Sequence, residues 1–173
     1  MKMKKYLILI LVLTISSLSQ AQKIKKNEVD KFTKSEIIET SIESLYSVNL
    51  MGTGWCNKFE FSLRRVNGNY SMPASILMND IVKYTEEDGV TFLLENEETV
   101  TLKTNFTGVG SESFGKGYWF RTSFNLSPEN IEKLKNNKIT AIRINYLGGK
   151  YDRDIKGNKQ SLIINSFKLF DSL

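Results

Sequence analysis

Hydrophobic and polar residues alternate along most of the chain after residue 34, and a period of two is typical of β-strands. In FEFSLRRV, residues 59–66, aromatic and aliphatic side chains alternate with polar ones. Asn67-Gly68 follows directly and is a strong signal for a β-hairpin. The returning segment, residues 70–78, contains Pro73, which lacks an N–H, so we expect an edge strand or a bulge there.

The alternation continues through most of the remaining chain. We expect further strands within residues 80–85, 90–95, 99–104, 117–126 and 138–147, separated by turns rich in acidic residues or glycine. Residues 35–48, SEIIETSIESLYSV, fit a helix or a strand. The density of β-branched residues and the lack of a helix stop signal favour a strand.

The period changes in SPENIEKLKNN, where Ser127 suits an N-cap and Pro128 suits the first helical position. This pattern predicts a short helix near 128–136. The tail fits both helical and strand spacing, and we favour a C-terminal helix near 159–171. The fold class is therefore mainly β (α+β), either an antiparallel β-sandwich or a curled sheet with these helices.

The first 21 residues have the layout of a secretory signal peptide, with three early lysines, an apolar run and Ser19-Gln20-Ala21. We expect cleavage after Ala21 and export to the periplasm or the outside of the cell, with no membrane span afterwards. Residues 22–34 are rich in lysine and predict a flexible basic leader. Residues 35–173 then form a single β-rich domain.

The positive charge of the whole chain comes largely from this signal segment. The chain has 24 basic and 19 acidic residues; residues 1–21 hold three lysines and no acid, which leaves 21 basic and 19 acidic residues. So small an excess gives no reason to expect binding of nucleic acid.

The chain contains no histidine and a single cysteine, Cys56. These counts exclude serine or cysteine nucleophiles activated by histidine, and also tetrahedral zinc sites with nitrogen and sulfur ligands. Cys56 has no histidine to activate it and is either a half-buried apolar residue or a reactive or pairing thiol. We therefore expect a monomer or a weak homodimer.

Two segments resemble ligand loops without completing them. Residues 110–116 match G-x4-G-K, but Gly117 stands where a P-loop has Ser or Thr, and a strand follows instead of a helix. Residues 151–158, YDRDIKGN, resemble a calcium loop but place Lys156 at a ligand position. We expect no cofactor and no bound metal.

Aromatic residues remain as candidates for a binding surface. Trp119 and Arg121 alternate with core-facing positions, and Trp55 and Tyr151 lie in or near predicted loops, so these four residues form a candidate surface for a protein or glycan ligand. The most economical hypothesis is a non-catalytic, exported binding domain. The alternatives are a glycan hydrolase that uses carboxylates alone, or a structural or assembly protein of the cell envelope.

Overall fold

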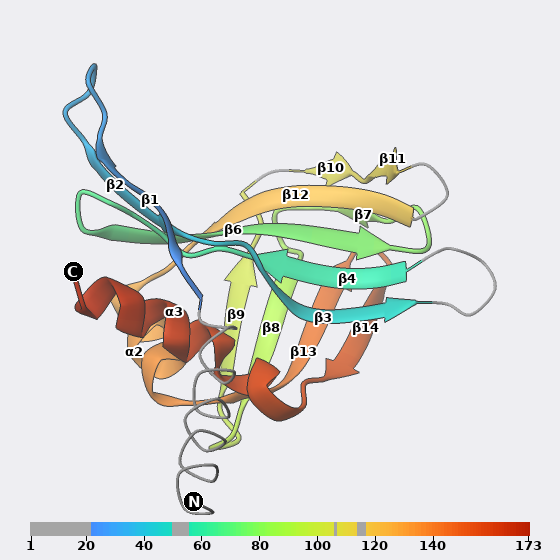
Figure 1. Ribbon diagram of the computed structural model, residues 1–173. Coiled ribbons are helices and arrows are strands. Elements are labelled where there is room, and N and C mark those ends of the chain that lie inside the picture. Colours follow the sequence, from blue (N-terminus) through green and yellow to red (C-terminus); the bar gives the residue numbers. More distant parts are fainter. Residues whose placement is uncertain (1–21, 50–55, 106, 114–116) are drawn as a thin grey trace, which may run out of the picture.

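Two antiparallel sheets face one another in the computed structural model, which describes residues 22–49, 56–105, 107–113 and 117–173 (Figure 1). The larger sheet holds β1 (Ile24–Val29), β2 (Glu36–Thr40), β3 (Glu43–Asn49), β4 (Cys56–Phe61), β5 (Arg64–Val66), β6 (Asn69–Met78), β11 (Ser111–Ser113) and β12 (Gly117–Asn125).

The smaller sheet has the order β14-β13-β8-β9 and packs against the larger one. Its strands are β8 (Gly89–Leu94), β9 (Thr99–Lys103), β13 (Ile139–Tyr146) and β14 (Gly149–Asp154). β7 (Lys83–Tyr84) and β10 (Gly108–Val109) form a separate two-stranded ribbon. This arrangement confirms the predicted mainly β fold.

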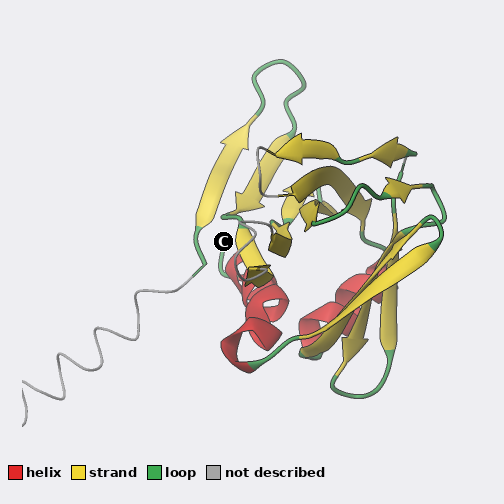
Figure 2. Cartoon of the chain, turned by 90° about the vertical axis from the view of Figure 1, so that its right-hand side faces the viewer, coloured by secondary structure: helices red, strands yellow, loops and turns green. Residues whose placement is uncertain are grey.

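Two helices lie at one end of the sheets. Helix α2 (Pro128–Asn136) has the predicted bounds, and the tail forms a 3-10 turn η1 (Gly157–Ser161) followed by α3 (Leu162–Asp171), which confirms the predicted C-terminal helix. Figure 2 shows the helices from the side, together with the β1–β2 hairpin, which projects beyond the rest of the larger sheet. No helix in the described part of the chain is both long and apolar enough to span a bilayer.

A bend runs across the larger sheet, because two long strands are each interrupted. β2 and β3 are separated by Ser41-Ile42, and β4 and β5 by Ser62-Leu63. Pro73 lies opposite the second interruption, and its carbonyl accepts a hydrogen bond from the Ser62 N–H at 3.0 Å. The nitrogen of Pro73 points to that same side and has no hydrogen to donate, so the ladder breaks there.

This finding corrects both expectations for Pro73. β6 is not an edge strand, because β4 and β5 pair with one of its sides and β12 pairs with the other. It is not bulged at the proline either, because its register with β12, and its register with β4 and β5, continue across Pro73 without a shift. The ladder lacks only the hydrogen bond that the proline nitrogen cannot donate. A proline in a central strand is tolerated here because the neighbouring strand is also interrupted at this point.

Residues 24–29, which lie inside the leader expected over 22–34, form β1 and pair with β2. Most of the side chains of β1 are exposed, so the strand is held mainly by backbone hydrogen bonds to its neighbour. Because this strand buries few side chains, its sequence shows no alternation of hydrophobic and polar residues. The sequence therefore indicates a flexible segment where the structure has a strand.

The core is built from the inward residues of both sheets. Phe59 of β4 meets Phe92 of β8 edge to face, with ring centroids 6.1 Å apart, and Tyr84 stacks on Phe120 at 3.9 Å. At the helical end, Tyr70 of β6 contacts Phe167 and Phe170 of α3. One continuous apolar cluster therefore joins both sheets and α3.

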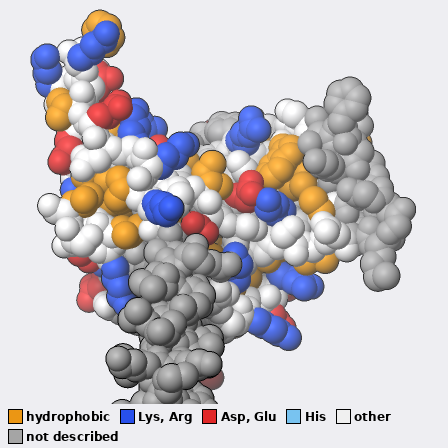
Figure 3. Space-filling view, viewed as in Figure 1, with side chains coloured by type: hydrophobic (Ala, Val, Ile, Leu, Met, Phe, Trp, Pro, Cys, Tyr) orange, Lys and Arg blue, Asp and Glu red, His pale blue; other side chains and the backbone are white. Residues whose placement is uncertain are grey.

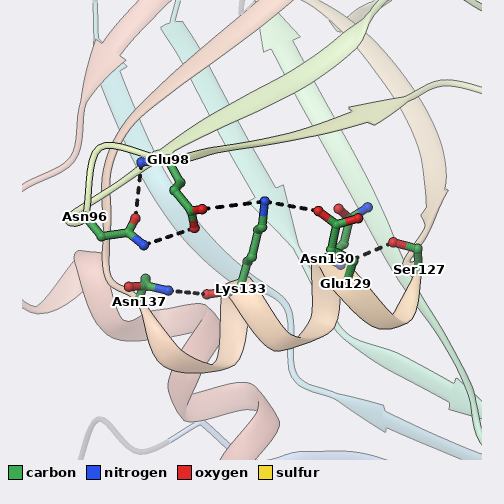
Figure 4. A network of polar contacts seen from close by, with 7 residues as sticks. All are labelled: Asn96, Glu98, Ser127, Glu129, Asn130, Lys133 and Asn137. Atoms are coloured by element: carbon green, nitrogen blue, oxygen red, sulfur yellow. Dashed lines mark hydrogen bonds and ion pairs between the residues drawn. The ribbon is translucent and has the colours of Figure 1, made fainter.

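Helix α2 is fixed to the turn between β8 and β9 by a polar network (Figure 4). The Ser127 hydroxyl accepts a hydrogen bond from the Asn130 N–H at 3.2 Å, as an N-cap should. Lys133 lies between Glu129, at 3.1 Å, and Glu98 of the turn, at 3.9 Å. These two carboxylates, Glu129 first, raise the pKa of Lys133 and keep it charged.

Candidate functional site

The structure places three of the sequence candidates on the outward face of the larger sheet. Trp119 of β12 lies in register with Leu77, and Arg121 with Ser75, while Cys56 opens β4 on the same face. Trp119 and Cys56 are half-buried and Arg121 is exposed. Figure 3 shows a hydrophobic patch at the upper right of the molecule, in the region of the larger sheet.

Of the other two aromatic candidates, Trp55 lies outside the described residues. Tyr151 is not on this face. It belongs to β14 of the smaller sheet, where its ring meets Tyr46 of β3 with centroids 6.0 Å apart. The described members of the expected binding surface, Trp119, Arg121 and Tyr151, are therefore divided between two places.

Cys56 has one basic neighbour on its face of β4, and that neighbour is already engaged. Lys58 forms an ion pair with Glu60, which is also on this face. Lys58 is therefore not a free base beside the thiol.

A groove of about 1060 Å³ runs along β3 and β14. In the described part of the chain, β3 pairs only with β4, and β14 pairs only with β13. The groove thus includes residues of one free edge from each sheet. It also extends across the smaller sheet, where β13, β8 and β9 contribute further lining residues. Its lining residues are Ser44, Leu45, Tyr46, Ser47, Val48, Lys58, Thr91, Leu93, Thr99, Ala141, Ile142, Arg143, Asp152, Arg153, Asp154, Ile155, Lys156 and Lys159.

β3 continues the path of β2 along the chain, and its free edge begins at the point where the pairing of β1 with β2 ends. The Ser41 N–H donates to the Lys23 carbonyl at 2.7 Å, and Ile24 pairs with Thr40. Beyond Ser41 no described strand continues along this side of the sheet. Free edges present rows of N–H and C=O groups that can pair with another strand.

Tyr46 lies in the wall of this groove, and its side chain is buried, with 7% of the residue exposed. Its hydroxyl has no hydrogen-bond partner among the described residues. Burial, and after it the neighbouring Tyr151 and Tyr84, raise the pKa of Tyr46, whereas the positive charge of Arg153 acts in the opposite direction. The hydroxyl is therefore a neutral donor near the Arg153 guanidinium.

The groove is lined by five basic and two acidic side chains. Arg143 and Asp152 satisfy one another through two hydrogen bonds of 2.7 Å, and Lys58 is paired with Glu60. Arg153, Lys156 and Lys159 have no ion-pair partner within the described ranges, and Figure 3 shows basic side chains beside β14. Their unneutralised charge makes the groove positive.

The two acids of the groove do not form an evident pair for acid and base catalysis. Asp152 and Asp154 lie two residues apart on the outward face of one strand, and both are exposed. The Arg143 guanidinium lowers the pKa of Asp152, so this carboxyl stays ionised and is a poor proton donor. In the described residues no three histidine, cysteine or acidic side chains gather as metal ligands would.

The sequence predicted neither the groove nor the place of Tyr46 in it, and Tyr151, which was a candidate, contacts Tyr46 without lining the groove. Tyr46 sits in an alternating segment and resembles a core residue, and nothing local indicates that its strand has a free edge. The available signal was the basic cluster at Arg153, Lys156 and Lys159, of which the first two lie in the segment that resembles a calcium loop.

Comparisons with known proteins found no match to this chain among protein-family models, curated proteins or solved structures.

Proposed function

We propose that this protein is an exported, non-catalytic binding domain that takes an extended polypeptide segment as an added β-strand in the groove between β3 and β14. The observation that carries the proposal is the pair of free strand edges on the two sides of one groove. An added strand forms main-chain hydrogen bonds with an edge, and its alternate side chains enter pockets beside that edge.

The dimensions of the edges suit such a ligand. β3 has seven residues and β14 has six, which are ordinary lengths for a strand of an antiparallel sheet. The groove offers side chains of both kinds, with Leu45 and Val48 from β3 and threonines from the smaller sheet. A polypeptide satisfies both the backbone edges and these side chains, whereas a glycan has no backbone amides for the edges.

A direct test uses a synthetic seven-residue peptide of alternating valine and glutamate, and compares it with two N-methylated versions. N-methylation at the odd positions removes the N–H groups that point to one side of the peptide strand, and methylation at the even positions removes those of the other side. We expect both versions to bind more weakly than the parent peptide, because each loses its hydrogen bonds to one edge.

Amide hydrogen exchange locates the binding site in the same experiment. The backbone amides of β3 and β14 should exchange more slowly when the parent peptide is present, while those of β1, an edge strand that contributes no residue to the groove, serve as the control. Binding that is indifferent to N-methylation, or protection confined to other strands, contradicts the proposal.

A further inference from the structure

We propose that the groove selects an acidic segment, and that the Tyr46 hydroxyl and the Arg153 guanidinium together receive one carboxylate of the bound chain. This inference rests on the proposed binding of a strand between β3 and β14. It adds the chemistry of the partner, which the free edges alone do not specify.

The first argument is the charge that remains after the internal ion pairs are formed. Three basic side chains of the described groove have no ion-pair partner: Arg153, Lys156 and Lys159. Asp154 is the acidic lining residue of the described groove that is left to neutralise part of their positive charge. A segment that carries carboxylates would neutralise this excess, whereas a basic segment would add to it. Charge complementarity therefore favours an acidic partner.

The second argument is the unsatisfied hydroxyl of Tyr46. A buried polar group without a partner destabilises the fold, so a ligand that supplies an acceptor recovers part of that cost. A carboxylate has two oxygens and accepts only, which lets it take one hydrogen bond from a phenol and another from a guanidinium. Lysine and arginine side chains of a partner cannot accept either bond.

The third argument is the freedom of Arg153. Its side chain is exposed, it has no described ion-pair partner, and its charge already acts on Tyr46. By contrast, Arg143 is held by Asp152 and cannot turn toward a ligand without breaking that pair. Arg153 is thus the arginine of the groove that can bind a carboxylate without breaking a described ion pair.

The decisive variant is Tyr46→Phe, which removes the hydroxyl and keeps the ring against Tyr151. The peptide of alternating valine and glutamate is compared with the same peptide in which glutamine replaces glutamate. We expect the wild-type protein to prefer the glutamate peptide by on the order of tenfold, and Tyr46→Phe to lose much of that preference.

The stability of Tyr46→Phe separates binding from folding. Because the variant removes a buried hydroxyl without a partner, its midpoint of urea unfolding should equal or exceed that of the wild type. Arg153→Gln should also reduce the preference for glutamate. Lys168→Gln, on an exposed position of α3, removes the same charge away from the groove and should preserve it.

The outcomes distinguish this inference from the proposed function. If the glutamine peptide binds as tightly as the glutamate peptide and both remain sensitive to N-methylation, strand addition stands and the acidic preference is wrong. If the glutamate peptide binds but is insensitive to N-methylation, the proposed function is wrong. Full preference for glutamate in Tyr46→Phe contradicts the role of the hydroxyl.

Discussion

Single aromatic side chains hold the two sheets together, and Phe59 is the clearest case. It is fully buried and touches Phe92 of the opposite sheet. We expect Phe59→Ala to lower the free energy of unfolding by about 3–5 kcal/mol, because the cavity spans the contact between the sheets. Urea denaturation measures this loss. Phe32→Ala removes the same ring from a position that is 83% exposed and should change stability little.

The ion pair of Arg143 with Asp152 predicts a dependence of stability on pH. Arg143 lowers the pKa of Asp152 below its ordinary value of 3.8, so the ionised carboxyl stabilises the fold above that value. This stabilisation is lost as the pH falls through the lowered pKa. The side chains are about half exposed, so the effect should be at most about 1 kcal/mol.

The test compares Asp152→Asn with the wild type by urea denaturation at neutral pH and in acid. The two proteins should differ at neutral pH and converge where Asp152 is protonated. Asp154→Asn is the matched control, because Asp154 lies on the same face of β14 and makes no described ion pair. An Asp152→Asn variant as stable as wild type at neutral pH would refute the contribution.

At the scale of residues, the sequence allowed predictions that depend on which residue types are present. It did not allow predictions that depend on which residues lie close together in the folded protein. The absence of histidine is visible in the sequence and limits the reactions of Cys56. The unsatisfied Tyr46 hydroxyl is not visible, because it depends on Tyr151 and Arg153, which lie more than a hundred residues away in the chain.

Elements whose signals are local could be predicted well. Helix α2 begins and ends where its cap and stop residues place it. The strand ends at Asn67-Gly68 also follow the sequence, since this turn needs residues that tolerate positive φ, and both have it. β1 escaped prediction because its stability comes from the β2 edge and not from its own side chains.

The Ser127 cap gives a prediction for α2. Ser127→Ala should cost about 1 kcal/mol, because the Asn130 N–H loses its side-chain acceptor. Ser127→Asp keeps an acceptor at the same position and should be close to the wild type. Equal stability of the alanine and aspartate variants in urea denaturation would show that the cap contributes little.

The groove could not be predicted from elements either. Each of its edges is an ordinary strand in sequence, and only the packing of the two sheets brings them to the same place. The local pattern specifies which face of a strand is buried, but not whether the strand has a neighbour on both sides. The strand order therefore had to come from the structure.

At the scale of the whole molecule, β1 begins just after the expected cleavage site. Cleavage after Ala21 leaves Gln22 first, and β1 starts at Ile24. We expect a chain of residues 22–173 to be recovered from the exported fraction, identified by its intact mass. A chain that starts after Val29 lacks β1 and should be less stable, whereas the chain that starts at Gln22 keeps every described strand. An exported protein that retains residues 1–21 would contradict the cleavage.

The two free edges also determine how copies of the protein behave toward one another in concentrated solution. Open edges invite pairing between molecules, and natural sheets discourage it with charge. Here Arg153, Lys156 and Lys159 would meet the same cations of a second copy, and this repulsion weakens as salt shortens the screening length to about 10 Å at 0.1 M. Salt should therefore weaken the binding of an acidic partner and at the same time favour self-association, so that recognition and solubility both decrease as the ionic strength rises.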